Sequence, residues 1–382
     1  MNRARFSWLI LFGLVLFTTA ASVAQFKQTA NINVSPSPEF LSMADFNNDG
    51  IPDLVVSLNL PNNIAVLLGA GDGTFPTRFV FGSGLRGTYG SLAVGDFNED
   101  GNVDIGVLYD GFLNIYAGNG DGTFHLLSSA TIGSFSVWST VADFNHDGHL
   151  DIATANNASS DLSVLLGNGD GTFQTTTEYS LVSAAAQVRA VDVNQDGHPD
   201  LVTVPACSDR NCTHGELDVL LNNGDGTFQP PLRFDAGIFP QGFAVADLNK
   251  DGKVDVAVTN DNSAGGTVSV LLGNGDGTFG SPVPYPVEFG PLSVAIADFD
   301  GDGNPDLAVA NATSNTVSLL RGNGDGTFQP AQGFRIGENP SDILAADFNG
   351  DGLPDLAFPL HEAHHVSVYT NQRSVFAIAP PR

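Results

Sequence analysis

The sequence predicts an all-β fold, a seven-bladed β-propeller of four-stranded antiparallel blades. The first observation is a nine-residue acidic loop, D-x-[N/D]-x-D-G-x-x-D, that occurs seven times, with copies starting 47 to 55 residues apart. The second is the set of short strand-like segments in every repeat, and the third is the mismatch between the two chain ends. A period near 50 residues is typical of units that bury their apolar faces only against their neighbours. The loops begin at Asp45, Asp96, Asp143, Asp192, Asp247, Asp298 and Asp347.

One repeat contains four strand-like segments. In the repeat of residues 292–336, an apolar run at 292–297 precedes the acidic loop, and a second run at 307–310 follows it. A third run at 316–320 leads to Gly-Asn-Gly-Asp-Gly-Thr-Phe, and a fourth extended segment ends near Ile336. Apolar runs separated by Gly, Asn and Asp are typical of strands joined by hairpins. Four strands in each of seven repeats lie within the usual range for a propeller.

The two chain ends predict how the ring closes. In five of six junctions, 19 residues separate the Phe of the GDGTF segment from the next acidic loop, and Phe26 precedes Asp45 by the same 19 residues. The seventh repeat stops after Tyr369, without a GDGTF segment or a fourth strand. We therefore expect the N-terminal segment to supply the outer strand of the last blade, which leaves no open sheet edge.

The acidic loops predict calcium sites. Three carboxylates and a side-chain amide in one tight turn would repel one another without a hard cation, and oxygen-only ligands favour Ca²⁺ over zinc or copper. Positions one, three, five and nine would offer side-chain oxygens, and position seven a backbone carbonyl. The alternative, that the acids only cap hairpins, requires one Asp or Asn and not four. The expected ligands of up to seven ions are Asp45, Asn47, Asp49, Ile51, Asp53; Asp96, Asn98, Asp100, Asn102, Asp104; Asp143, Asn145, Asp147, His149, Asp151; Asp192, Asn194, Asp196, His198, Asp200; Asp247, Asn249, Asp251, Lys253, Asp255; Asp298, Asp300, Asp302, Asn304, Asp306; and Asp347, Asn349, Asp351, Leu353, Asp355.

The pattern D-F-N-x-D-G-x-x-D-L followed by V-S-V-L-L-G-N-G-D-G-T-F resembles the FG-GAP/VCBS repeat family and is similar to the β-propeller of integrin α subunits. The resemblance covers residues 25–372. It implies that the loops bind Ca²⁺ on one face of the propeller and that ligands are recognised mainly on the other. The remaining parts of an integrin have no counterpart here. The aspartates of the GDG turns are expected to cap turns, and the following Phe to pack between blades.

The N-terminal residues and the net charge of the chain indicate where the protein is located and which partners it does not bind. Arg3 and Arg5 precede an apolar run at 6–17 and a small-residue site at 22–24, which is typical of a signal peptide at residues 1–24. An uncleaved anchor is the alternative, but the run is short for a membrane span. The propeller at 25–372 and a tail at 373–382 would then be secreted, extracellular or periplasmic, without membrane insertion. A net charge of −28 argues against nucleic-acid binding. Cys207 and Cys212 are expected to form a local disulfide.

The innermost strands carry one unexpected charge. Small residues precede most loops by one and three positions, which suits strands crowded near an axis, but Arg189 occupies one of these positions. It would either pair with an acid of a neighbouring blade or be presented to an anion near the axis. Pairing is the favoured alternative.

The variable loops opposite the calcium sites hold candidate ligand-binding aromatics, which could stack on a sugar or peptide or could simply plug the channel mouth. These residues are Phe40, Tyr89, Trp138, Phe239 and Phe289. His361, His364 and His365 could bind zinc, but exposed loop histidines are the simpler interpretation. No catalytic triad or catalytic carboxylate pair stands out.

These observations predict a monomeric, calcium-stabilised binding or adhesion module for glycans or proteins. The alternatives are a propeller-based polysaccharide lyase or hydrolase, which would assemble its site from distant loops, and a structural spacer in an extracellular assembly.

Overall fold

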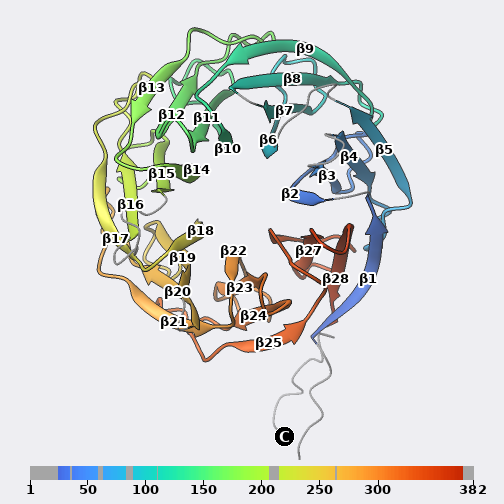
Figure 1. Cartoon of the computed structure of the whole chain (residues 1–382), viewed down its shortest axis with the longest axis vertical. Helices are drawn as coiled ribbons and strands as arrows, with labels where there is room; N and C mark the ends of the chain where they lie inside the picture. Colours follow the sequence, from blue (N-terminus) through green and yellow to red (C-terminus); the bar gives the residue numbers. More distant parts are fainter. Residues whose placement is uncertain are drawn as a thin grey trace, which may run out of the picture.

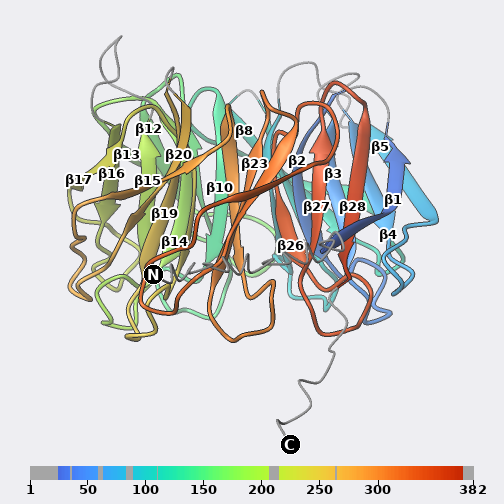
Figure 2. The ribbon, with the colours of Figure 1, turned by 90° about the horizontal axis from the view of Figure 1, so that it is seen from below.

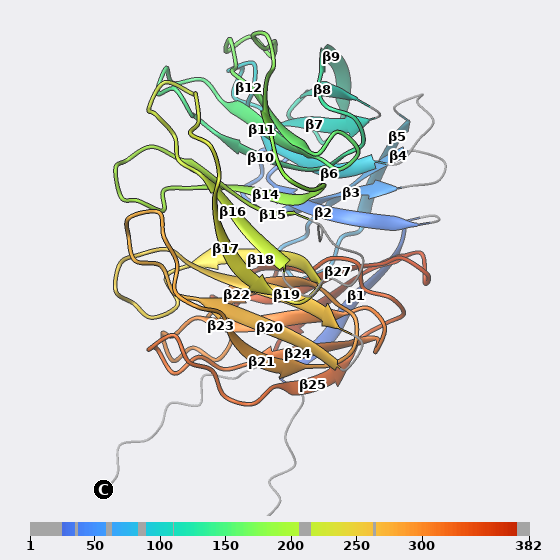
Figure 3. The same cartoon turned by 60° about the vertical axis from the view of Figure 1, so that its left-hand side comes forward.

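A computed structural model describes residues 25–34, 37–58, 63–82, 89–109, 111–205, 215–262 and 265–372. Within these ranges the chain forms 28 strands in seven four-stranded antiparallel sheets and no helix. Figure 1 shows the sheets arranged as blades around a central axis, with one strand of each blade facing that axis. Seen from the side and at an angle, the blades form one closed disc (Figures 2 and 3). The predicted seven-bladed propeller is confirmed.

Each blade runs from an innermost strand to an outermost one, and consecutive strands pair. Blade one is β2 (Pro38–Ala44), β3 (Asp53–Leu58), β4 (Asn63–Leu68) and β5 (Thr77–Gly82); blade two is β6 (Tyr89–Gly95), β7 (Asp104–Tyr109), β8 (Phe112–Gly118) and β9 (Phe124–Thr131); blade three is β10 (Ser136–Ala142), β11 (Asp151–Asn156), β12 (Asp161–Leu165) and β13 (Thr177–Ser180); blade four is β14 (Ala185–Val191), β15 (Asp200–Pro205), β16 (Gly215–Leu220) and β17 (Leu232–Gly237). Blade five is β18 (Pro240–Ala246), β19 (Asp255–Asn262), β20 (Gly265–Leu271) and β21 (Val283–Val287); blade six is β22 (Pro291–Ala297), β23 (Asp306–Asn311), β24 (Thr316–Leu320) and β25 (Gln332–Arg335); blade seven is β26 (Leu344–Ala346), β27 (Asp355–Leu360), β28 (His365–Asn371) and β1 (Phe26–Asn33).

The sequence pattern of each strand reflects its place in the blade. Second strands such as β3 and β11 are buried at every residue, and third strands such as β12 are almost as enclosed. Such strands are continuous apolar or small-residue runs because both of their faces are covered by other blades. Outermost strands such as β5 alternate between exposed and partly buried residues, because only one face packs inward. The core therefore consists of clusters between neighbouring blades, each built from two adjacent sheets.

Ring closure follows the prediction from the chain ends. Strand β1 pairs antiparallel with β28, from Phe26 opposite Asn371 to Asn33 opposite His365, and completes blade seven (Figure 1). The Phe26 ring packs edge-on against Phe299 of blade six at 5.9 Å between centroids. In blades one to four the Phe of the GDGTF segment packs in a similar way on the Phe of the preceding loop, so Phe26 replaces the residue that the seventh repeat lacks.

The innermost strands share an irregularity near their first residues. In β2, β6, β10, β14, β18 and β22 the pairing register with the second strand shifts between seven and four residues before the acidic loop. A β-bulge redirects side chains and interrupts pairing. The repeated shift therefore sets the side chains at this end of the axis apart from the regular strand that follows.

Several predictions concern residues outside the described ranges. The signal peptide at 1–24, the disulfide between Cys207 and Cys212, and the tail at 373–382 all lie there. In the described part of the chain, no helix is long and apolar enough to cross a membrane.

Candidate functional site

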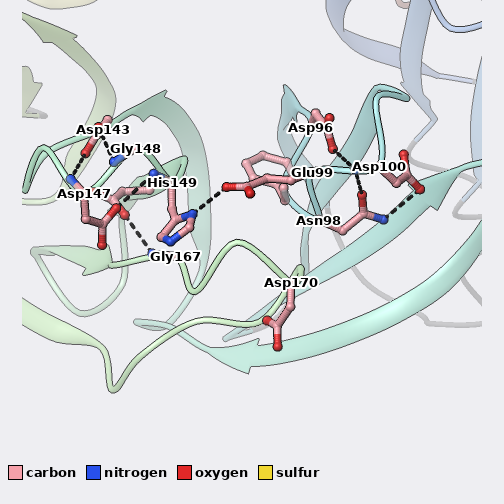
Figure 4. Close-up of polar contacts among 12 residues, drawn as sticks. Asp96, Asn98, Glu99, Asp100, Asp143, Asp147, Gly148, His149, Gly167 and Asp170 are labelled. Carbon is pink, nitrogen blue, oxygen red and sulfur yellow. Dashed lines mark hydrogen bonds and ion pairs between the residues drawn. The ribbon is translucent and has the colours of Figure 1, made fainter.

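Each acidic loop connects the first and second strands of a blade and is folded by its own carboxylates. In the loop between β10 and β11, Asp143 accepts hydrogen bonds from the backbone N–H groups of Asp147 at 3.2 Å and Gly148 at 3.0 Å (Figure 4). Asp147 in turn accepts the N–H of His149 at 2.9 Å. The glycine at position six has a φ of +90°, which side-chain-bearing residues rarely adopt. The first and fifth acids thus shape the turn as well as offering oxygens to a cation.

The ninth-position aspartate has a structural role that the sequence analysis did not identify. Asp151 is fully buried, and its two carboxylate oxygens accept the backbone N–H groups of Phe144 and Gly167, both at 2.7 Å. This links the loop to the end of the third strand of the blade. All seven ninth-position aspartates are fully buried and make the two equivalent bonds: Asp53, Asp104, Asp151, Asp200, Asp255, Asp306 and Asp355.

These buried carboxylates lie close to other carboxylates of the same loop. Burial raises the pKa of Asp151 to about 6, two backbone N–H donors oppose the shift, and the carboxylates of Asp147 and Asp143 add to it. Burial likewise raises the pKa of Asp200 and Asp355 to about 6. Carboxylates gathered around a buried member are what a bound cation would stabilise.

The loop of blade six is the clearest test of whether the residues fit a metal ion. It alone has a carboxylate at position three, and oxygens of Asp298, Asp300 and Asp306 lie within 4.8 Å of one another. Oxygens bound to one Ca²⁺ at ~2.3–2.6 Å are separated by at most about twice that distance. The donor set consists only of oxygen, as Ca²⁺ requires. The loop of blade six therefore fits the predicted ion by both chemistry and spacing, and the other loops share its oxygen-only chemistry.

The acidic loops of neighbouring blades contact each other through their fourth and seventh positions. Glu99 of the second loop hydrogen-bonds to Nδ1 of His149 in the third, and this bond raises the pKa of His149 (Figure 4). Asn48 donates to Asn102 at 2.9 Å, and Lys250 donates to Asn304 at 2.6 Å. The fourth-position residues adopt positive φ, which directs them toward the next blade. These contacts link the loops of blades one, two and three and those of blades five and six.

The GDG turns lie at the same end of the blades as the calcium loops, as expected. Gly122 donates its N–H to Phe46 of the preceding blade at 3.0 Å, and Gly171 donates to Phe97 at 2.8 Å. The aspartates cap their own turns: Asp170 accepts both the N–H and the hydroxyl of Thr172, and these bonds lower its pKa. The following phenylalanine packs on the second residue of the preceding loop, as Phe228 does on Phe144 at 5.4 Å.

The opposite end of the axis is built from unlike residues. We call the side chains five positions before each calcium loop the mouth ring, which consists of Phe40, Ser91, Trp138, Gln187, Gly242, Ser293 and Asp342. Three of its oxygens link neighbouring blades by accepting a backbone N–H of the next innermost strand. Ser91 accepts from Ser139 at 2.7 Å, Gln187 from Phe243 at 3.0 Å, and Asp342 from Leu41 at 3.4 Å.

Two hollows meet at Trp138. A mouth pocket of about 350 Å³ is lined by Glu39, Phe40, Trp138, Ala186, Gln187, Gln241, Leu292, Ser341 and His361. An axial cavity of about 310 Å³ is lined by Leu41, Ser42, Met43, Ser91, Leu92, Val94, Trp138, Ser139, Arg189, Asp342, Ile343 and Leu344. Trp138 belongs to both linings, and the Phe40 ring packs against it at 5.5 Å and 88°.

Among the described residues, Arg189 does not form the ion pair that was the favoured alternative. Its guanidinium lies 5.5 Å from the Trp138 ring centre and 5.9 Å from that of Phe243, and its Nε donates to the Phe243 carbonyl at 3.3 Å. Asp342 of blade seven attracts it electrostatically, but no ion pair joins Arg189 to any acid in the described ranges. Asp342 was not singled out in the sequence. Asp342 lies five residues before an acidic loop, the same position that Trp138 occupies in blade three, and this shared position was the signal that could have identified it.

The other predicted ligand-face residues are scattered. The structure brings Phe40 and Trp138 together, whereas Phe289 is 54 % exposed and Phe239 lies in the connection before β18, and neither lines the two hollows. The side chain of Tyr89 lies outside the described part. His361 lies 3.9 Å from Glu39, and Nδ1 of His364 accepts the N–H of Ser37 at 3.2 Å. No metal-binding group that includes a histidine is found among the described residues.

The fold and the repeated loops define a β-propeller of acidic-loop repeats. The model of the FG-GAP-like repeat matches residues 45–107, 96–154, 143–203, 206–258, 247–309 and 298–358, so the chain belongs to this family. No curated protein sequence gives a significant match.

Solved structures with the same fold have little sequence in common with this chain. One is an Agrocybe aegerita lectin described as recognising non-reducing terminal N-acetylglucosamine. It has 20 % identity and a TM-score of 0.54, over 78 % of this chain and 80 % of the lectin. Another is BBS1N in complex with ARL6DN, with 13 % identity and a TM-score of 0.61, over 92 % of this chain and 98 % of that chain. At these identities the similarity establishes the fold alone.

Proposed function

We propose that the protein is an exported, calcium-stabilised binding module that takes a glycan or protein ligand at the mouth of its axis, opposite the calcium loops. The family and the fold are those of a binding module. The signal-peptide pattern at residues 1–24 supports export, and the seven oxygen-rich loops support structural calcium.

The observation that carries the proposal is the contrast in chemistry between the mouth pocket and the rest of the surface. An aromatic pair, Phe40 and Trp138, lies beside the amides of Gln187 and Gln241 and the hydroxyl of Ser341. An apolar wall with a few converging polar groups is the usual composition of a ligand site. The calcium loops, in contrast, use their polar groups to hydrogen-bond to themselves and to neighbouring loops.

A glycan lectin is favoured over the other binding modules by the size and polarity of this pocket. Its volume of about 350 Å³ suits one or two sugar rings. The lectin with the same fold is described as recognising a terminal sugar, which shows that such a propeller can carry this function.

The test is a glycan array probed with the protein lacking residues 1–24, in millimolar Ca²⁺ and in EDTA. Calcium-dependent binding to one sugar class, lost in Trp138→Ala but retained in Phe289→Ala, would support the proposal. Phe289 is the matched control because it is an exposed aromatic residue on the same side of the propeller and outside both hollows. A blank array from folded protein would move the proposal to protein ligands, which a pull-down with the same variants would test.

A further inference from the structure

We propose that the axial cavity binds the carboxylate group of an acidic sugar through the guanidinium of Arg189. This inference rests on the proposed function, since it places the charged end of a glycan ligand in the cavity directly behind the mouth pocket. Trp138 lies between the two hollows and belongs to both linings.

Arg189 has hydrogen-bond donors that find no acceptor in the described part of the chain. A guanidinium carries five N–H donors, and it stays charged in proteins. Only Nε donates to a protein acceptor, the Phe243 carbonyl, and the Nη1 and Nη2 donors have no protein partner in the described ranges. The Trp138 and Phe243 rings hold the group in place, and burial lowers its pKa. A fixed, partly buried guanidinium with its terminal donors unused is suited to a planar anion that accepts two parallel hydrogen bonds.

The wall of the axial cavity, which Arg189 also lines, offers a further hydrogen-bond donor. The hydroxyls of Ser91 and Ser139 hydrogen-bond to each other at 3.1 Å, and Ser91 also accepts the N–H of Ser139. The bond between the two hydroxyls uses only one of their two hydrogens. One O–H is therefore left without an acceptor among the described residues, whichever hydroxyl donates.

Asp342 argues for a carboxylate on a sugar and against a small inorganic anion. This buried carboxylate lines the same cavity and accepts from Ser293 Oγ at 2.8 Å, from the Ile343 N–H at 2.9 Å and from the Leu41 N–H. A doubly charged anion such as sulfate would be repelled by it. A uronic acid carries one negative charge, for Arg189, and adjacent hydroxyls that can donate to a carboxylate such as Asp342.

The equivalent positions in the other blades show that Arg189 is not required by the packing of the axis. At three residues before the calcium loop the other blades carry Ser42, Ala93, Thr140, Ala244, Ala295 and Leu344. Because blade seven accommodates Leu344 there, Arg189→Leu is a substitution that the ring can accept. It also removes the charge and all five donors.

The experiment uses Trp138 as an internal reporter. The chain contains two tryptophans, Trp8 within residues 1–24 and Trp138, so protein starting at Gln25 has one tryptophan, in the cavity wall. Its fluorescence is titrated in millimolar Ca²⁺ with glucuronate and galacturonate, and with the neutral sugars glucose and galactose as matched ligands. The variants are Arg189→Leu and, as a control for the lost charge, Arg335→Ala on the exposed outer strand β25. Circular dichroism melting shows that each variant is folded.

We expect uronates to change the Trp138 emission saturably and the neutral sugars to bind at least about tenfold more weakly, because a charge-assisted hydrogen bond is lost. Arg189→Leu should weaken uronate binding by about tenfold or more, and Arg335→Ala should leave it unchanged. An equal response to sulfate and uronate, or equal binding by Arg189→Leu, would overturn the inference.

The remaining outcomes separate this inference from the proposed function. Neutral glycans that bind on the array while uronates leave Trp138 unchanged would overturn the acidic-sugar site and leave the binding module standing. A response to acidic peptides but to no sugar would show that the ligand class is wrong. A blank array together with a flat uronate titration would overturn the acidic-sugar site and move the proposed function to protein ligands, and a pull-down that also captures nothing would overturn both.

Discussion

The two ends of the propeller axis are built on opposite principles. At the calcium-loop end, every blade repeats the same bonds, so that each ninth-position aspartate is fully buried and holds the same two backbone N–H groups. At the other end, the mouth ring contains residues as different as Trp138, Gly242 and Asp342 at equivalent positions. Repetition is what a closed ring needs for stability, whereas a site for one ligand needs an asymmetric set of groups.

The two ends of the axis also differ in what their polar groups contribute to the free energy of unfolding. Polar groups of the loop end are satisfied locally, and their excess negative charge is what calcium would neutralise. The mouth end holds Arg189 with unused donors and the buried Asp342, both of which cost stability. Groups that are costly to bury and are not paired are expected where a protein binds something. The following predictions test this division, beginning with the largest effect.

Removal of calcium should have the largest effect, because it acts on all repeats together. At free calcium one hundredfold above Kd, each site adds about 2.7 kcal/mol to the free energy of unfolding if the unfolded chain does not bind the ion. Loss of several sites should lower Tm by more than about 10 °C. Scanning calorimetry in EDTA measures this, and EDTA presaturated with Ca²⁺ is the control. An unchanged Tm would mean that the loops are hydrogen-bonded turns without a structural ion.

A single ninth-position aspartate should matter more than a GDG aspartate of the same blade. Asp151→Asn places an amide N–H₂ against one of two buried backbone donors, so we expect a loss of about 1–3 kcal/mol in calcium, plus the loss of one proposed calcium ligand. Asp170→Asn removes the same charge from an exposed turn and should cost less than about 1 kcal/mol. Urea denaturation of both variants compares them. Equal losses would show that the buried link between loop and third strand adds little.

Prediction from sequence worked at the repeated end and much less well at the unique end. The blade count, the strand order and the closure by β1 followed from spacing, because each repeat must bury the same faces against its neighbours. The second role of Asp151 was missed because its donor, Gly167, is 16 residues away and carries no signal of its own. The meeting of Phe40, Trp138 and Arg189 joins three blades, and no periodic pattern encodes contacts between unlike residues.

The smallest predicted effect concerns Asp342 of the mouth ring. Burial raises the pKa of Asp342, and the Arg189 charge only partly opposes this. The folded state therefore binds this proton more tightly than the unfolded state. The resulting stabilisation is complete below the unfolded-state pKa near 4 and is lost as the pH rises through the higher folded-state value.

Asp342→Asn does not titrate, so its stability relative to the unmodified protein should increase between pH 4 and pH 7. At pH 7 we expect the variant to be within about 1 kcal/mol of the unmodified protein, because the loss of a buried charge offsets the amide N–H₂ that faces the Leu41 N–H, and Asn can still accept from Ser293 and Ile343. Denaturation midpoints across this pH range, in calcium, provide the measurement. A variant that is destabilised equally at every pH would place Asp342 with the structural aspartates of the loops. In that case the mouth ring would be held together by the same kind of bond as the calcium end, and the division between the two ends would fail at this residue.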